Sequence, residues 1–456
     1  MKTFKVILTF LIGGITASAQ GNLGAYIDNA ANNKFVEIAN ATNQISTPVD
    51  LDFHLDVINR PFELWVNNKG TSNSGGNTVI ISDADTDTPS HKYVRDGNAW
   101  HFMALSSGIA FGDNGNFATS QDIIDANRNG GKFTGPTLWP SDLSIYGIVG
   151  NPPTSQYNGS HLDMIHQSPY GKGIAWESDN VFWIMDGYDL TVKRYNFHGD
   201  HGPGQTYHGD GEVRVYKDVS FKKSLTATVP SHCVIDDNKQ WLYGCSTGDN
   251  KIFRLDITTG LYNKNLTKIN NEPLAEYSEF LNATVEEVIT TGLDKPVGID
   301  IVGNQLIVTN NGSGELIIYD IDDDFAEMGR ITPDYANADL MGVKIGPDGQ
   351  IYFVDYSNKK VVRIENDQSF PVSTDEILNE ATVKIYPNPS NSVMNFDFLE
   401  TPRSIEILNL NGKLIQSLDL ELRTQVDVSD LNAGIYLIKI SFEDKVIHRK
   451  ISVTKS

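Results

Sequence analysis

Short apolar runs separated by turn-forming residues dominate the chain and predict a protein built of β-strands. From about residue 165 to 366 these runs form a repeated unit of three short strands, joined by turns that contain Asp, Asn or Gly. Each unit leaves an apolar face that only a neighbouring unit can cover, so the repeat indicates a modular fold. The four clear copies span residues 173–195, 233–256, 297–320 and 341–364.

Radial stacking of such units predicts a β-propeller. Two weaker copies, at 49–82 and 107–120, bring the expected number of blades to about six. The pattern of the clear copies, as in Val297-Gly-Ile-Asp300, resembles the NHL-type propeller repeat. We therefore expect residues 20–365 to form an all-β propeller, with a β-sandwich or a β-helix as the alternative. A Gly- and Pro-rich stretch at 130–139 is predicted to be a long insertion.

The C-terminal part has the pattern of a separate small domain. A polar stretch at 366–379 is typical of a linker, and residues 380–456 show alternating apolar positions that predict an Ig-like β-sandwich. Tyr386-Pro-Asn-Pro389, the Asn-Gly turn within 409–413, and Leu431-Asn-Ala-Gly-Ile-Tyr436 resemble the C-terminal sorting domain of the type IX secretion system of Bacteroidetes. This resemblance implies recognition by the type IX machinery, passage across the outer membrane, and release or attachment at the cell surface.

The first 19 residues have the layout of a cleaved signal peptide, with a basic start, an apolar run at 6–15 and small residues at Ala17-Ser-Ala19. That run is too short to span a bilayer, and no other apolar run approaches the required length. We expect a soluble mature chain that begins near Gln20 and contains no transmembrane segment.

The net charge narrows the range of partners. Asp and Glu outnumber Lys and Arg by 58 to 36, which gives a formal net charge of −22. A chain this acidic repels nucleic acid, so no nucleic-acid partner is expected.

Two cysteines, Cys233 and Cys245, flank a segment with a predicted turn at its middle. A hairpin centred on Lys239 would place them directly opposite each other, within the range of a disulfide. A shift of one residue in register would separate them and leave two buried thiols instead.

Histidine is the residue type most indicative of chemistry. Six of the ten histidines lie within residues 161–232, and imidazole is a common ligand of zinc and copper. His166 and His232 stand just before the first strands of neighbouring blades, so we predict that they meet at one end of the central channel. Tyr170 and Met341 stand near comparable positions. The candidate metal ligands are His161, His166, His198, His201, His208 and His232.

The loop that carries His198, His201 and His208 lies between the third and fourth predicted strands of its blade. This position places the loop at the opposite end of the blade from His166 and His232, which makes it a separate candidate site. Asp200 and Asp210 in the same loop are candidate ligands for calcium.

The channel histidines resemble those of the peptidyl-hydroxyglycine amidating lyases, which are NHL-type six-bladed propellers with a zinc ion held by histidines from different blades. The resemblance implies that His166 and His232 are ligands. The third ligand is missing, because Val297-Gly298 and Met341-Gly342 stand at the corresponding positions of the last two copies. His161 is the candidate to replace it.

Two functional hypotheses remain open. In the first, the propeller is an extracellular binding module for a peptide or a glycan, with Trp139, Trp176 and Trp183 either as contacts or as core residues. In the second, it is a metal-dependent lyase or hydrolase. The sequence contains no Ser-His-Asp elbow, Walker loop or cysteine-based zinc motif, so it does not decide whether the protein is an enzyme.

Overall fold

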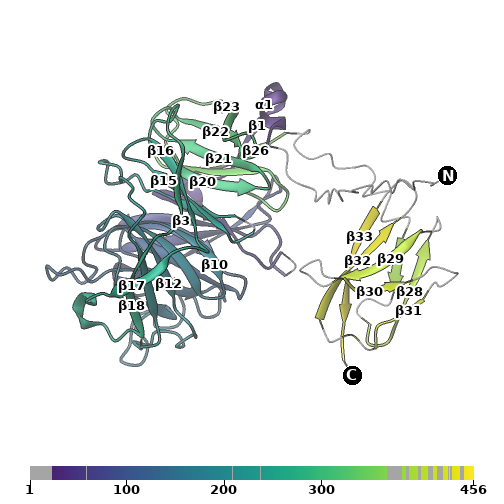
Figure 1. Ribbon diagram of the computed structural model, residues 1–456, viewed down its shortest axis with the longest axis horizontal. Helices are drawn as coiled ribbons and strands as arrows, with labels where there is room; N and C mark the ends of the chain where they lie inside the picture. The colour runs from purple at the N-terminus through teal and green to yellow at the C-terminus, as the bar shows by residue number, and fades with distance from the viewer. Residues whose placement is uncertain are drawn as a thin grey trace, which may run out of the picture. The chain divides into compact units, whose positions relative to one another are not determined.

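The computed structural model describes residues 23–366 except 58, 208 and 237, together with most of the strands of the C-terminal part: 383–386, 390–398, 402–408, 414–418, 425–429, 431, 434–441 and 446–455. The chain forms two compact units, residues 1–370 and 371–456 (Figure 1), and the division falls within the predicted linker. The predicted signal peptide, residues 367–379 of the linker, Pro387-Asn-Pro389 and residues 409–413 lie outside the described residues.

The first unit is a propeller of six blades, and each blade is built on four antiparallel strands of which the first is the innermost. The first blade comprises β2 (Pro48–Phe53), β3 (Leu64–Thr71), β4 (Gly75–Ser82) and β5 (Ser90–Val94). The second comprises β6 (Ser106–Phe111), β7 (Asn116–Gln121), β8 (Thr137–Pro140) and β9 (Asp163–Met164). The third comprises β10 (Gly171–Ser178), β11 (Val181–Asp186), β12 (Thr191–Asn196) and β13 (Glu212–Tyr216). The fourth blade comprises β14 (Cys233–Ile235), β15 (Trp241–Ser246), β16 (Lys251–Asp256) and β19 (Val285–Ile289). The fifth comprises β20 (Pro296–Val302), β21 (Gln305–Asn310), β22 (Glu315–Asp320) and β23 (Ala326–Ile331). The sixth comprises β24 (Leu340–Ile345), β25 (Ile351–Asp355) and β26 (Lys360–Glu365) together with β1 (Lys34–Ala39).

The ring of blades is closed by strands from both ends of the unit. The early strand β1 pairs antiparallel with β26, so Lys34 lies opposite Glu365 and the sixth blade contains residues from both ends. The inner strands contact one another in the order β2, β6, β10, β14, β20 and β24, and β24 contacts β2 again. The all-β propeller predicted from the repeats is therefore confirmed, and the two weaker copies are the first and second blades.

The apolar alternation of the strands places one hydrophobic cluster between each pair of neighbouring blades. Ile109 on β6 packs towards the first blade, for example, whereas Ala110 packs towards the third. Both faces of every inner strand are therefore buried. Trp139 and Trp183 are fully buried in these clusters, so they are core residues.

One feature of the third blade was not predicted. The segment between β16 and β19 leaves the fourth blade and forms β17 (Leu261–Asn265) and β18 (Glu276–Leu281). β18 pairs in parallel with β13, and β17 pairs with β18, so the third blade has six strands (Figure 1). The predicted insertion at 130–139 is also partly wrong, because its last residues belong to β8.

The short helices lie at the start of the unit and in connections. These are α1 (Ala25–Asp28), α2 (Ala99–Phe102), and the 3-10 turns η1 (Ala30–Asn32), η2 (Ala41–Asn43) and η3 (Ile269–Asn271). In the described part of the chain, no helix has the length and apolar character needed to span a membrane.

The second unit contains two sheets that share one apolar core, as expected of a sandwich. Met394 and Phe396 from one sheet pack with Ile405 and Ile438 from the other. The first sheet comprises β27 (Val383–Tyr386), β28 (Val393–Phe398) and β31 (Gln425–Asp427). The second comprises β29 (Ser404–Leu408), β30 (Leu414–Leu418), β32 (Gly434–Ser441) and β33 (Val446–Val453).

Cys233 and Cys245 are free, buried thiols. Cys233 lies opposite Gly244 and not opposite Cys245, so the hairpin is shifted by one residue from the predicted register. As a result, Cys233 packs towards the third blade and Cys245 towards the fifth. Burial raises the pKa of both thiols above the ordinary value.

We expect Gly298→Ala to destabilise the propeller, because a Cβ atom there would lie 2.2 Å from the carbonyl oxygen of Met341 on the next inner strand. Overpacking of this kind costs about 1–3 kcal/mol of unfolding free energy. Gly199→Ala is the matched control, since no atom lies within 4 Å of the added methyl group. Urea unfolding of both variants measures the difference; an equal effect of the two substitutions would contradict the close approach of the inner strands.

Candidate functional site

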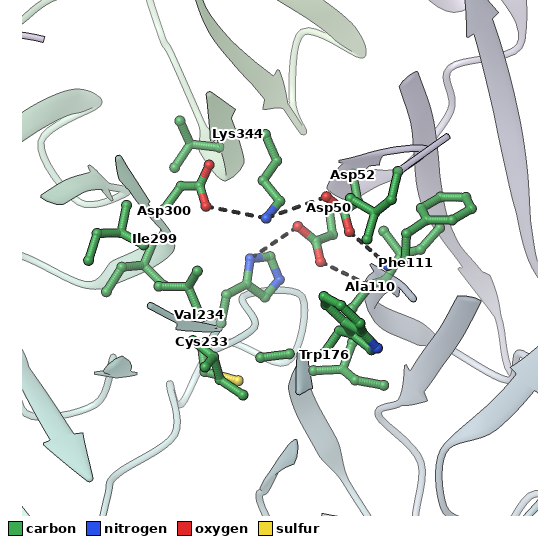
Figure 2. A pocket seen from close by; sticks show the side chains of 18 of the residues that line it. Asp50, Asp52, Ala110, Phe111, Trp176, Cys233, Val234, Ile299, Asp300 and Lys344 are labelled. Atoms are coloured by element: carbon green, nitrogen blue, oxygen red, sulfur yellow. Dashed lines mark hydrogen bonds and ion pairs between the residues drawn. The ribbon is translucent and has the colours of Figure 1, made fainter. Parts of the chain in front are cut away.

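A cavity of about 220 Å³ lies in the central channel and is lined by the inner strands of all six blades (Figure 2). Its lining residues come from the later part of these strands, and Leu55 and Lys239 follow β2 and β14. The cavity, called here the channel pocket, therefore lies towards the end of the channel at which the inner strands finish. Its charged residues are Asp50, Asp52, His232, Lys239, Asp300 and Lys344.

Carboxylates of the channel pocket bind backbone N–H groups of the neighbouring blade. An inner strand has a sheet partner on one side only, so some of its N–H groups need acceptors elsewhere. Asp52 accepts a hydrogen bond of 2.8 Å from Phe111 N on β6. Asp300 makes the equivalent bond of 2.7 Å with Ile345 N on β24. Asp50 accepts a bond of 2.9 Å from Ile109 N.

Lys344 lies between two of these carboxylates (Figure 2). Its Nζ is 3.2 Å from Asp300 Oδ1 and 3.4 Å from Asp52 Oδ1. Burial raises the pKa of Asp50, Asp52 and Asp300 above the ordinary value, and the neighbouring positive charges only partly offset this effect. Burial would lower the pKa of Lys344, but the charges of the three carboxylates outweigh it and raise this pKa. Because three carboxylates share one lysine, these carboxyl groups bind protons up to a higher pH than an ordinary Asp does.

His232 crosses the channel from the fourth blade. Its Nε2 donates a hydrogen bond of 2.9 Å to the carbonyl oxygen of Ser107 in the second blade, which fixes a proton on this nitrogen. Its Nδ1 lies 3.5 Å from Asp50 Oδ1 in the first blade, opposite its own. This contact brings side chains from the first and fourth blades together in the channel pocket.

The rim of the channel pocket carries an aromatic residue. Trp176 is half-buried, and the Nζ atom of Lys239 lies 4.2 Å from the centre of its ring. Leu55, which also lines the pocket, is 42% exposed. The pocket therefore combines buried charges with an apolar rim, which suits a ligand that has both hydrogen-bonding groups and an apolar face.

The predicted pairing of His166 with His232 in the channel is wrong. His166 lines a different cavity, together with His161. The physical reason is that Glu272, which the sequence analysis did not single out, accepts bonds of 3.0 Å from His166 N and 2.7 Å from His166 Nδ1. This carboxylate belongs to the segment that forms the extension of the third blade, and it ties the chain before β10 to that extension.

The loop histidines do not gather at one point in the described residues. His201 Nε2 bonds to Asp210 Oδ1 at 2.9 Å, and His198 Nε2 lies 3.4 Å from Glu212 Oε1. Asp200 accepts a bond from the side chain of Asn116, so it is engaged separately from Asp210.

The remaining predicted residues are accounted for as follows. His208 lies outside the described residues. Tyr170 contacts Lys223 through its ring, and Met341 is fully buried in the core. Among the residues that the structure describes, no group of three or more His, Cys, Asp or Glu side chains is placed so that it could hold a metal ion.

Sequence reasoning missed the charged residues of the channel pocket, although the repeat contains a signal for them. Asp300 and Lys344 occupy the same position in consecutive copies, two residues after Gly298 and Gly342. Residues at equivalent positions of neighbouring inner strands face each other around the channel. Opposite charges at such positions therefore predict an ion pair.

A protein-family model matches the C-terminal unit. Residues 384–454 match the model of the secretion system C-terminal sorting domain. This domain marks proteins exported by the type IX system to the cell surface or the medium, so the chain is a secreted protein of the Bacteroidetes type. A search of curated proteins gave no match.

Solved structures similar to the chain include an auxiliary nutrient binding protein from Bacteroides thetaiotaomicron, with 10% identity, a TM-score of 0.47, and coverage of 71% of this chain and 70% of that protein. A second auxiliary nutrient binding protein, from Bacteroides ovatus, has 11% identity and a TM-score of 0.44 over 73% of this chain and 76% of its own. Virginiamycin B lyase from Staphylococcus aureus has 14% identity and a TM-score of 0.40 over 73% and 99%. Similarities this distant carry no argument about function.

We expect Lys344→Met to destabilise the propeller at neutral pH, because it leaves the channel carboxylates without their cation. Lys344 keeps 25% of its side chain exposed, so the expected loss is about 3 kcal/mol, the lower end for a broken buried ion pair. A carboxylate whose pKa is raised by folding contributes stability below its unfolded pKa and loses it as the pH rises. The loss should therefore be largest near pH 7 and nearly vanish near pH 4, a range set by the ordinary Asp pKa.

The matched control is Lys251→Met, which breaks the exposed pair with Glu287 and should cost less than about 1 kcal/mol at either pH. Thermal and urea unfolding between pH 4 and pH 8 measure both variants. A loss that does not depend on pH in Lys344→Met would contradict the charge balance described for the channel pocket.

Proposed function

We propose that this propeller, exported by the type IX system, is an extracellular binding module that holds the end of a peptide or a glycan in the channel pocket. The observation that carries the proposal is the pocket itself, in which buried charges from several blades surround a cavity open to a partly apolar rim. The inner strands of all six blades position these side chains, so the site is rigid before a ligand enters. Such preorganisation favours binding.

The size of the channel pocket limits what can enter it. At about 220 Å³ it is smaller than the usual pocket for a drug-sized ligand, and it suits a single sugar ring or amino-acid side chain. The rest of a longer ligand would lie over the rim, where Trp176 and Leu55 offer apolar contact.

The charge of the channel pocket favours neutral hydroxyl-rich or positively charged end groups. Asp50, Asp52 and Asp300 share Lys344 inside the pocket, and the other lysine of the lining, Lys239, lies at the rim beside Trp176. Carboxylates accept hydrogen bonds from hydroxyl and ammonium groups, and they repel a ligand carboxylate. Uronic acids and acidic side chains should therefore bind poorly.

The metal-dependent lyase or hydrolase is not the function that we propose for the channel. Among the described residues that line the channel pocket, His232 is the single histidine, and its Nε2 already donates to Ser107. A metal site in this position would need further nitrogen or oxygen ligands to converge with it.

We expect Asp50→Asn to weaken ligand binding at least about tenfold, the loss typical of one charge-assisted hydrogen bond. The substitution keeps the shape of the side chain and an acceptor for Ile109 N, so the fold should be retained. Screening of the mature chain on glycan and peptide arrays identifies a ligand, and calorimetry then compares the variants with it.

Asp323→Asn, at an exposed position between β22 and β23, is the matched control and should bind like the wild type. Binding that is equally tight in Asp50→Asn would show that the ligand does not use the channel pocket. The absence of any bound ligand on both arrays would contradict the binding function.

A further inference from the structure

Two buried lysines share a single carboxylate at the end of the channel opposite the channel pocket. Lys69 Nζ lies 2.9 Å from Asp122 Oδ2, and Lys172 Nζ lies 2.6 Å from Asp122 Oδ1. Lys69 lies in the last part of β3, Asp122 follows β7, and Lys172 is the second residue of β10. The three side chains therefore link the first, second and third blades where the inner strands begin, and we call them the lysine cluster.

The lysine cluster has one positive charge in excess. Its three side chains keep only 4–5% of their surface exposed. Among the residues that the structure describes, Asp122 is the one carboxylate that pairs with either ammonium group. A buried charge without a counter-charge is costly, because little water reaches it. One monovalent anion would balance the cluster.

The lysine cluster also has more N–H donors than acceptors. An ammonium group has three N–H donors, and in the described part of the chain Asp122 supplies the one acceptor for Lys69 and for Lys172. The remaining donors of both buried ammonium groups need an acceptor. An anion provides one, because it accepts bonds from several donors at once.

Asn67 brings a further donor to the same place. Its side chain is fully buried, and neither its Nδ2 nor its Oδ1 has a hydrogen-bond partner among the described residues. Asn67 precedes Lys69 by two positions on β3, so both side chains lie on the face of the strand that is turned towards the second blade, as Trp65 does. A buried amide without a partner is itself costly, and a ligand between the first two blades would satisfy it.

We infer that the lysine cluster binds a small monovalent anion, chloride, through Lys69, Lys172 and the side-chain amide of Asn67. The three groups offer N–H donors and positive charge, which is the reverse of what the carboxylates of the channel pocket offer. A monatomic ion suits this position, because the side chains around it are almost completely buried.

Lys223 extends the positive charge from the lysine cluster towards the surface. It is half-buried, and its Nζ donates a bond of 2.8 Å to the carbonyl oxygen of Gly187. Burial lowers the pKa of Lys172 more than Asp122 raises it, and the charges of Lys69 and Lys223 lower it further. An anion is therefore attracted to this end of the channel, although the whole chain has a formal net charge of −22.

The inference is independent of the function proposed for the channel pocket, because no residue of the lysine cluster lines that pocket. The test compares the mature chain in sodium chloride and in sodium gluconate at equal ionic strength. Gluconate has the same charge as chloride but is too large to enter the cluster. We expect the melting temperature to be higher in chloride and to rise with its concentration.

Two measurements on the same chain give the stoichiometry and the position of the ion. Calorimetry in gluconate should show one chloride bound per chain, and anomalous scattering from crystals grown in bromide should locate one halide beside Lys172. Equal melting temperatures in the two salts, together with no halide in the crystals, would overturn the inference.

Variants of the lysine cluster separate chloride binding from folding. Lys172→Met leaves Lys69 and Asp122 as a balanced pair, so it should remain folded and bind chloride at least about tenfold more weakly. Asn67→Leu removes the amide at similar volume, and it guards against a Lys172→Met chain that fails to fold. We expect it to weaken chloride binding about tenfold, while its melting temperature in gluconate is not lower than that of the wild type.

Lys222→Met is the matched control, because this neighbour of Lys223 keeps 69% of its side chain exposed. It should bind chloride like the wild type. A halide that is bound equally by the wild type, Lys172→Met and Asn67→Leu would be an adventitious ion only, and would overturn the inference.

Discussion

The first strand of every blade has a partner in its own sheet on one side only, and the side facing the channel is left with backbone groups that need hydrogen bonds. Water or side chains must provide these bonds. In this propeller, three of the N–H groups are bound by carboxylates of the preceding blade: Phe111 by Asp52, Ile345 by Asp300, and Ile109 by Asp50. The carboxylates thus link neighbouring blades near the axis, where apolar packing alone cannot satisfy the backbone.

This constraint also explains the chemistry of the channel pocket. Carboxylates placed beside inner strands become buried, and their pKa values rise because burial disfavours the charged form. Lys344 balances part of this charge from the sixth blade, and His232 approaches Asp50 from the fourth. The groups that complete the ring are therefore the same groups that a ligand entering the channel would meet. Structure and proposed function share one set of side chains.

The number of blades could be predicted because every blade repeats one pattern of apolar strands and turns, which is a local property of the sequence. The position of His166 could not be predicted, because it depends on a hydrogen bond to Glu272. Glu272 lies about one hundred positions away in the sequence, in the extension of the third blade that the repeat pattern does not reveal. The residue that lies opposite Cys233 could not be predicted either, because a shift of one residue in the register of the hairpin changes it. The channel charges were within reach of the sequence, since Asp300 and Lys344 occupy equivalent positions, but an apolar strand pattern does not by itself show which charged residues face the channel.

Hydrogen exchange of the inner strands tests the carboxylate links most directly. Mass spectrometry of the full chain would follow the amides of β6 and β24 in Asp52→Ala and in Asp300→Ala. The account predicts that Asp52→Ala speeds exchange at the end of β6 and leaves β24 unchanged, and that Asp300→Ala does the reverse. If both variants remain folded and neither changes the exchange of the next inner strand, the carboxylates do not hold the blades together and the central claim is wrong.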